Sequence, residues 1–226
     1  MKIGIIVASD KERKPFFEVF GSPDMHHVGL NAYETSMWRI SSEKFIYLIL
    51  SGIGEIAAAT STQYLIDTFN VDRIINYGVA GGLTEHQPVM TLGIVERVVH
   101  YGFDATPSTN YRVGEYPKLG LYHSPYLDAV PDSAVQDLPK FICASADIVV
   151  DSGEPKRRLY REYRANICEM EAAGIVLTCN RNKIPCTIIK AVSDGVNDDI
   201  EVFNRYVYSA SKACVVLVAN LIKTAF

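Results

Sequence analysis

Two carboxylates, Glu169 and Glu171, flank Met170 at the start of an apolar segment. Successive side chains point in opposite directions where the chain is extended, so one carboxylate could reach a pocket beside the methionine. The alternative is structural, because acidic residues in the first turn of a helix interact favourably with the helix dipole. The spacing leaves both interpretations open.

A third carboxylate, Asp194, ends an apolar run and follows the hydroxyl of Ser193. An aspartate that ends a buried strand and faces a pocket is a candidate general acid. It could also cap the element that follows the strand, as aspartate often does. The Ser193-Asp194 pair is therefore a candidate acid site with a structural alternative.

Glycines cluster in the segment 78–82, with the sequence GVAGG, after a predicted strand. The cluster either forms a tight turn or lets the backbone approach a ligand closely, because glycine has no side chain. The pattern is not GxGxxG opening a helix, and the N-terminal strand also lacks that pattern. A dinucleotide-binding enzyme is therefore disfavoured.

A framework of strands and helices must position these residues, and the hydrophobic pattern predicts one. A tight turn at 51–54 opens a helix, and the stretch 102–139 is expected to form long loops with at most a short helix. Predicted strands cover residues 2–8, 33–40, 45–50, 73–77, 93–100, 141–146 and 185–193, and predicted helices cover 15–20, 55–69, 171–182 and 200–224.

The alternation of strands and helices indicates an α/β fold with a mixed, largely parallel sheet flanked by helices. A length of 226 residues fits a single domain, residues 1–226, with one core. Ligands in such sheets bind beyond the carboxyl ends of the strands. The segments 9–12, 78–82 and 193–194 all fall at that edge, so we expect them to meet there.

Composition argues against several classes of partner. The net charge is −4 and the 22 Lys and Arg residues are scattered, which disfavours binding to nucleic acid or to a membrane surface. There is no apolar run of about 18 residues to predict a transmembrane helix, and residues 1–14 make a poor signal peptide. The five cysteines form no CxxC pair and no ligand spacing with histidine, so we expect reduced thiols in a cytoplasmic protein and no metal site.

The ordered set of motifs resembles the methylthioadenosine/S-adenosylhomocysteine nucleosidases, within the wider superfamily of purine nucleoside and uridine phosphorylases. Each motif is short, but together they follow the family order over nearly the whole chain. The resemblance implies a nucleoside phosphorylase-like fold, no cofactor, and hydrolysis of the N-glycosidic bond of an adenine nucleoside. The matching segments are residues 1–8 with Glu12, 51–54, 78–83, 100–106, 169–173 and 193–194.

The resemblance also implies a role for five side chains. Asp194 would be the general acid that protonates N7 of the purine, and Ser193 would orient it. Glu171 would accept hydrogen bonds from the ribose hydroxyls and stabilise the cationic sugar, and Met170 would pack against the ribose. Glu12 would be the base that activates the attacking water. An acid on one side of the sugar and an ionised base on the other form a consistent mechanism.

The chain departs from the family pattern at three positions. The aromatic ring that stacks on the base in relatives is missing near Val149, so stacking is either lost or supplied by another residue such as Phe203. Val79 stands where relatives have a small polar residue, and Lys190 where they have arginine. Both positions lie near the water and the sugar in relatives, so the substrate and the nucleophile stay open. The contacts with substrate that the resemblance implies are Ile53, Val79, Ala80, Gly81, Val149, Val150, Met170, Lys190, Ser193 and Phe203.

Two other functions compete with hydrolysis. A phosphorylase of the same superfamily would use phosphate in place of water and predicts arginines at the glycine segment, but the segment 78–83 has none. Lys190 is the one cation expected near the sugar, where it could bind phosphate or pair with Glu12 or Glu171. The other alternative is a nucleoside-binding protein without catalysis, which would have no reason to keep Glu12, Glu171 and Asp194 together.

The segment 106–117 is long for a loop and carries the apolar residues Tyr111, Val113 and Tyr116. In the family that the chain resembles, the equivalent segment covers the pocket of the neighbouring subunit near the 5′ group of the nucleoside. The resemblance therefore implies a homodimer.

Replacing Asp194 by asparagine tests its role as the acid. We expect Asp194→Asn to lower the rate of base release by roughly 10²–10⁴-fold while the fold is kept, because an amide supplies no proton and has nearly the same volume. Measuring free base from a nucleoside, together with circular dichroism, checks this. Near-normal turnover of a folded Asp194→Asn protein would exclude the assignment.

Overall fold

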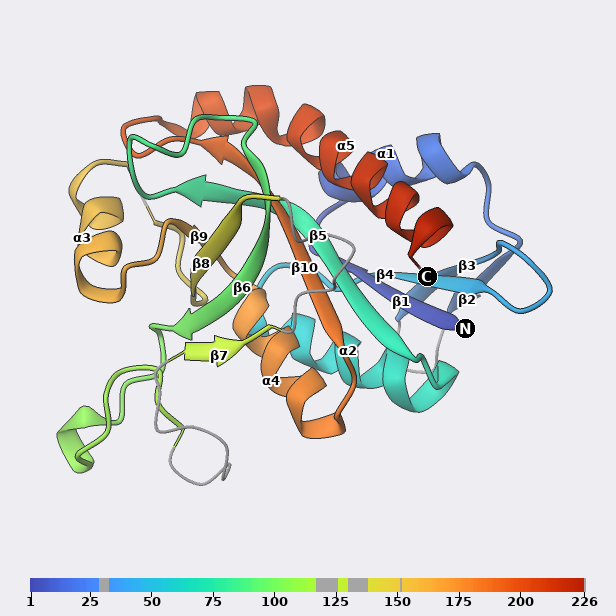
Figure 1. The fold of residues 1–226 in the computed structure, drawn as a ribbon, viewed down its shortest axis with the longest axis horizontal. Helices are drawn as coiled ribbons and strands as arrows, with labels where there is room; N and C mark the ends of the chain where they lie inside the picture. The colour runs from blue at the N-terminus through green and yellow to red at the C-terminus, as the bar shows by residue number, and fades with distance from the viewer. Residues whose placement is uncertain (29–32, 117–125, 130–137, 151, 226) are drawn as a thin grey trace.

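The computed structural model of the chain describes residues 1–28, 33–116, 126–129, 138–150 and 152–225. Within these residues, ten strands form one mixed sheet (Figure 1). The strands are β1 (Lys2–Val7), β2 (Met25–Val28), β3 (Glu34–Arg39), β4 (Phe45–Leu50), β5 (Arg73–Gly82), β6 (Leu92–His100), β7 (Tyr126–Asp128), β8 (Lys140–Ser145), β9 (Ile167–Glu169) and β10 (Cys186–Asp194). The helices are α1 (Asp10–Phe20), α2 (Glu55–Phe69), α3 (Glu154–Tyr163), α4 (Ala172–Asn182) and α5 (Ile200–Thr224), with a short 3-10 helix, η1 (Thr106–Ser108).

The sheet is parallel at its centre, and its antiparallel pairs lie at one edge and at β10–β6, β5–β9 and β6–β7. β4, β1, β5 and β10 are neighbours in that order and run parallel, whereas β4, β3 and β2 form the antiparallel edge. β10 also pairs with β6, β6 with β8, β8 with β9, and β9 returns to β5, so five strands close on one another. This closure brings β9, which ends at Glu169, against the glycine-rich end of β5.

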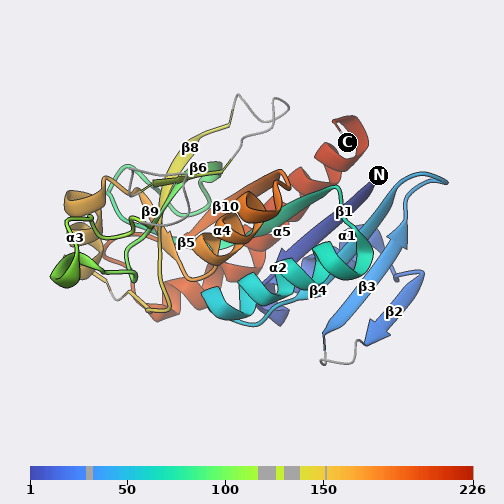
Figure 2. The same ribbon diagram turned by 90° about the horizontal axis from the view of Figure 1, so that it is seen from below.

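Helices cover both faces of the sheet. α2 and α4 pack together on one face, and α1 and α5 pack together on the other (Figures 1 and 2). Each face has its own buried core, which includes Leu65 and Ile175 on the first side and Phe16 and Val215 on the second. α3 lies at the end of the molecule beside β8 and β9, where its Leu159 joins a third, smaller apolar cluster.

The predicted α/β fold is confirmed, and every predicted strand is present. The first helix begins at Asp10 instead of residue 15, because Ser9 caps it by accepting a hydrogen bond from the N–H of Glu12 (3.4 Å). β5 continues through the glycine cluster to Gly82, where β9 and β10 pair with it. The tight-turn interpretation of the segment 78–82 is therefore wrong.

Four elements were not predicted: β2, β7, β9 and α3. The three strands have only three or four residues each, too few for a periodic pattern. The helix has the sequence EPKRRLYREY, and its two buried residues are Lys156 and Leu159. Because one of them is charged, no apolar periodicity marks the helix. Within the stretch expected to form loops, the structure has η1 and β7, and residues 117–125 and 130–137 lie outside the described residues.

One helix among the described residues, α5, is long and apolar enough to span a membrane by length and composition. Half of its apolar window is buried in the fold, where the helix packs on β5 and β10. Glu201, Arg205 and Lys212 lie exposed on its outer side. This two-sided pattern is typical of a core helix that covers a sheet.

All five cysteines are buried and free. Burial raises the pKa of the Cys143 thiol and of the Cys214 thiol, the latter to about 12, which favours the neutral form. The prediction of core thiols is confirmed.

Candidate active site

Glu12 lies in the first turn of α1, where the carboxyl ends of β1 and β5 meet. The hydroxyl of Ser9 donates to its Oε2 (2.8 Å), and the N–H of Val79 donates to its Oε1 (3.0 Å). A Cβ at Gly78 would lie 2.4 Å from Oε1 of Glu12, so no other residue fits there without displacing the carboxylate. The group that lies close to Gly78 is therefore the side chain of Glu12, and the predicted approach of the glycine segment to a ligand stays a prediction.

Glu171 stands at the residue before α4, and its side chain reaches the turn before α2. Its Oε1 accepts a hydrogen bond from the N–H of Gly54 (3.0 Å), whose φ of +107° favours glycine. Burial, and next the charge of Glu169, raise the pKa of Glu171 to about 8 against the opposing effects of Lys190 and the Gly54 N–H. Glu171 is thus a carboxyl group that keeps its proton more readily than usual.

Lys190, on β10, forms an ion pair with Glu169, with 3.0 Å between Nζ and Oε2. Its side chain is 2% exposed and that of Glu169 is 3% exposed. The carboxylate of Glu169 also accepts hydrogen bonds from the N–H groups of Glu171 (3.1 Å) and Ala172 (3.0 Å). The expected pairing of Lys190 with Glu12 or Glu171 is therefore corrected: its partner is Glu169, whose carboxylate also satisfies the start of α4.

The charges around Lys190 set the ionisation of four buried residues: Lys190, Glu169, Glu171 and Glu12. Burial alone would lower the pKa of Lys190, but the three glutamates raise it above its usual value. Burial opposes ionisation of Glu169, yet Lys190 and a hydrogen bond from Ser145 lower its pKa overall. The pKa values of the two glutamates that flank Met170 are thus shifted in opposite directions, a pattern typical of acid–base sites.

Asp194 ends β10 and is held on both of its oxygens. The hydroxyl of Ser193 donates to Oδ1 (2.5 Å), as the predicted orienting role requires. The ammonium of Lys156, from α3, donates to Oδ2 and to the backbone oxygen of Gly195, the latter at 2.8 Å. Lys190 is therefore not the only cation at the site, and Lys156 is a residue that sequence reasoning missed.

The sequence did carry a signal for Lys156. Lys156 and Leu159 are three residues apart on a helix, and they are the two buried positions of α3. Side chains at this spacing share one helix face. A helix assignment for the segment would have placed the lysine on the inward side, but nothing local shows that it would meet Asp194.

The segments that contain the predicted contacts Ile53 and Val149 lie side by side, because the N–H of Glu55 donates to Oδ1 of Asp147 (2.6 Å). This contact brings Ile53 and Val149 to one rim of the site, where they are 65% and 79% exposed. Val150 instead packs against the apolar cluster that contains α3. The rim therefore offers exposed apolar side chains and backbone groups, and no aromatic ring at these positions.

The other predicted contacts differ in their distance from the carboxylates. Ala80 is buried in β5, and a Cβ at Gly81 would lie 3.2 Å from Oδ2 of Asp194. Met170 is half-buried at the junction of β9 and α4. Phe203 is half-buried at the start of α5, with the ammonium of Lys11 5.9 Å from its ring centroid. Among the described contacts, none joins Phe203 to the carboxylates.

Beyond the predicted residues, the structure has a histidine contact near the turn before α2. His100 Nε2 lies 2.5 Å from Oε2 of Glu55, and its Nδ1 contacts the hydroxyl of Tyr116. Both Glu55 and His100 are largely buried. The described residues contain no group of three or more His, Cys, Asp or Glu side chains that could hold a metal ion.

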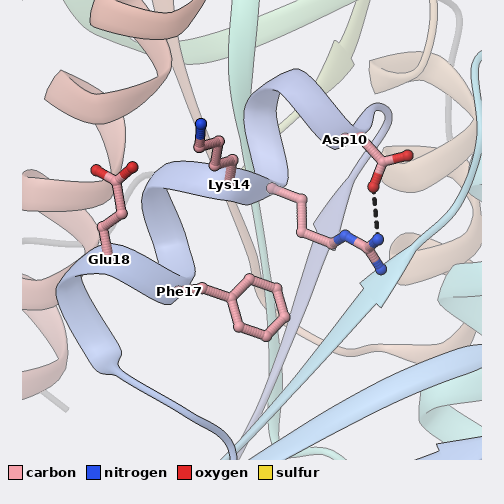
Figure 3. Close-up of a pocket in the computed structure, with 5 residues that line it drawn as sticks. Asp10, Lys14, Phe17 and Glu18 are labelled. Carbon is pink, nitrogen blue, oxygen red and sulfur yellow. Dashed lines mark hydrogen bonds and ion pairs between the residues drawn. The ribbon is translucent and has the colours of Figure 1, made fainter.

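A separate depression lies on the outer face of α1 (Figure 3). Asp10 and Arg13 form an ion pair there (2.5 Å), and Lys14, Phe17 and Glu18 complete the lining. Glu12 is one of the buried residues of the same helix and faces the sheet instead. The depression is thus separate from the carboxylates described above.

The sheet, the two layers of helices and the carboxylates at the strand ends define a nucleoside phosphorylase-like α/β protein. A profile of the family described as the phosphorylase superfamily matches residues 2–223, and the chain belongs to that superfamily.

Similar proteins are nucleosidases by name. The chain is 29% identical over 232 residues to a 5′-methylthioadenosine/S-adenosylhomocysteine nucleosidase of Shewanella piezotolerans, covering 99% of both chains. It is 27% identical over 206 residues to an aminodeoxyfutalosine nucleosidase of Helicobacter pylori, covering 88% of this chain and 87% of that protein. The crystal structure of a Helicobacter pylori 5′-methylthioadenosine/S-adenosylhomocysteine nucleosidase has a TM-score of 0.88 at 22% identity, covering 99% of this chain and 98% of that chain.

The raised pKa of Glu171, about 8 against an ordinary value of 4.5, has a consequence for stability. A carboxyl group with a raised folded-state pKa stabilises the fold fully below its unfolded-state pKa and loses that contribution as pH rises through the folded value. Between about pH 5 and pH 8, we expect the free energy of unfolding of the wild type to fall relative to Glu171→Gln, by on the order of a few kcal/mol.

Urea unfolding at several pH values measures this difference. Glu162→Gln, which neutralises an exposed carboxylate on α3, is the control and should follow the wild type. Parallel pH dependence of the wild type and Glu171→Gln would contradict a protonated Glu171 in the folded protein.

Proposed function

We propose that the protein is a cytoplasmic N-glycosyl hydrolase that releases adenine from a 5′-substituted adenine nucleoside of the methylthioadenosine or S-adenosylhomocysteine type. The observation that carries the proposal is the placement of Asp194, oriented by Ser193, beyond the same strand ends as Glu12 and Glu171. The relatives named above, which are nucleosidases, support the substrate class. Five buried free thiols fit a reducing compartment.

The proposed reaction moves one proton onto the base and one away from water. Asp194 in its protonated form gives its proton to N7 as the bond between C1′ and N9 breaks, and the bonding electrons leave with adenine. Glu171 forms hydrogen bonds with the ribose hydroxyl groups and so stabilises the cationic sugar. Glu12 accepts a proton from the water that bonds to C1′ and then releases it to solvent, while solvent returns a proton to Asp194. Electrostatic stabilisation of the developing positive charge supplies a large share of the catalysis.

The charge balance favours water over phosphate as the nucleophile. A phosphorylase must hold a dianion next to C1′, which takes several Arg or Lys donors. Among the described residues, the two buried lysines of the site are already bonded to carboxylates, Lys190 to Glu169 and Lys156 to Asp194. A phosphate group near Glu12 would face negative charge, whereas a neutral water gains a proton acceptor there.

A homodimer is part of the proposal. Four exposed apolar side chains surround the contact between Glu55 and Asp147: Ile53, Ile56, Ile148 and Val149, at 65%, 75%, 53% and 79% exposure. Contiguous exposed apolar side chains beside a site are typical of a protein interface. A second copy of the chain would cover this rim and would exclude water from that side of the site.

Product analysis tests the nucleophile. We expect the protein to release free adenine and the free 5-substituted sugar from methylthioadenosine in phosphate-free buffer, with no increase in rate when millimolar phosphate is added. Chromatography of both products from a panel of adenine nucleosides measures this. A sugar 1-phosphate, or a rate proportional to phosphate, would make the protein a phosphorylase, and binding without release would make it a nucleoside-binding protein.

The variant Glu12→Gln sharpens that assay. It should lose hydrolysis by roughly 10²–10⁴-fold and still bind a nucleoside analogue in calorimetry, because Glu12 acts on water. Glu18→Gln, in the same helix with a carboxylate exposed to solvent, is the matched control and should keep full activity. Loss of binding together with turnover would make Glu12 a structural or binding residue.

The proposed dimer is tested at Ile56. Ile56→Asp buries a charge in the proposed interface, so light scattering at micromolar concentration should give a mass near 25.1 kDa, and twice that for the wild type. Val216→Asp, at an apolar residue 47% exposed on α5, should stay dimeric. A fully active wild-type monomer would refute the proposal.

A further inference from the structure

We propose that Lys156 is a positioning residue for the acid step: it holds the carboxylate of Asp194 as an ion pair and thereby confines efficient base release to lower pH. This inference rests on the proposed function, in which Asp194 is the proton donor. It adds to that function a lysine from α3, far from the motifs that point to the reaction.

The geometry places Lys156 behind the carboxylate instead of in the open site. Its side chain is 1% exposed, while that of Asp194 is 15% exposed. The ammonium donates to Oδ2 of Asp194 and to the backbone oxygen of Gly195 (2.8 Å), and Ser193 donates to Oδ1. Both carboxylate oxygens are therefore held by donors from the protein, which restricts the rotation of the carboxyl group.

The pair lies directly against the backbone of Gly81. A Cβ at Gly81 would lie 3.2 Å from Oδ2 of Asp194 and 3.3 Å from Nζ of Lys156. The N–H of Gly153, which precedes α3, donates to the backbone oxygen of Val196 (2.6 Å), so the helix itself is tied to the segment after β10. The ion pair is thus built into the contact between α3 and the end of β10.

Other ionisable groups lie near the pair on β9, on α3 and in the segment after β10. Burial raises the pKa of the Cys168 thiol, on β9, to about 12, with Lys156 lowering it and Asp194 raising it, so this neighbour is neutral. Asp198 accepts a hydrogen bond from the N–H of Gly195 (2.7 Å). Arg157 points outward, 3.7 Å from the carboxylate of Glu85. Among the described neighbours, Lys156 is the cation bonded to Asp194.

This arrangement has a chemical consequence. An ammonium beside a carboxyl group favours its ionised form, whereas a general acid must carry a proton when the substrate arrives. Removing the ammonium should therefore extend base release to higher pH. If Lys156 only held α3 in place, its removal would reduce activity by the same factor at every pH.

The test compares kcat/KM for adenine release between pH 5 and 10 in the wild type, Lys156→Met, Lys156→Arg and Arg158→Met. We expect the alkaline fall of kcat/KM in Lys156→Met to move to higher pH, because one cation is lost beside the acid. Lys156→Arg keeps the charge and should keep the wild-type profile. Arg158→Met removes an exposed cation from the same helix and is the control.

Each outcome decides the question. An alkaline limb in Lys156→Met that coincides with that of the wild type overturns the role of Lys156 and leaves the proposed hydrolase intact. If thermal melting shows that Lys156→Met is unfolded, Lys156→Gln, which keeps hydrogen bonding without charge, is judged by the same criterion. Absence of base release from the folded wild type at every pH refutes the proposed function, and the role of Lys156 falls with it.

Discussion

The buried ammonium of Lys190 must pair with a carboxylate, and this requirement fixes how β9, β10 and α4 meet. Breaking such a pair by removing one partner destabilises a fold by about 3–5 kcal/mol, so a carboxylate must reach the lysine inside the sheet. Glu169 does so from β9 and also accepts hydrogen bonds from the first N–H groups of α4. One ion pair therefore joins β10, β9 and α4, and it sets where Glu171 stands.

Two buried lysines divide the four acids of the site into two kinds. Glu169 and Asp194 are each bonded to an ammonium, whereas Glu12 and Glu171 are held by N–H groups of Val79 and Gly54. The closed ring of five strands makes this division possible, because it brings β9 and β10 against the same glycine-rich end of β5. Glycine at 78 and 81 leaves the space that two carboxylates occupy.

Elements with a long apolar pattern were predictable from the sequence. β1, β4, α2 and α5 lie within about a residue of their predicted bounds, because hydrophobic periodicity is a local property of the chain. β9 was missed because its three residues form a strand only by pairing with β5 and β8. Likewise, the glycine cluster was predicted to form a tight turn or to approach a ligand, and only its pairing with β9 and β10 shows that it continues β5.

The sequence by itself determined the fold class, the superfamily pattern and which acidic side chains stand near the carboxyl ends of strands, since residue type and strand order are read along the chain. Only the tertiary structure decided which charge each lysine meets. Lys156 and Asp194 are 38 residues apart in sequence. Their contact, like that of Lys190 with Glu169, exists because burial forces each ammonium to pair with whichever carboxylate the packing of strands and helices brings within reach.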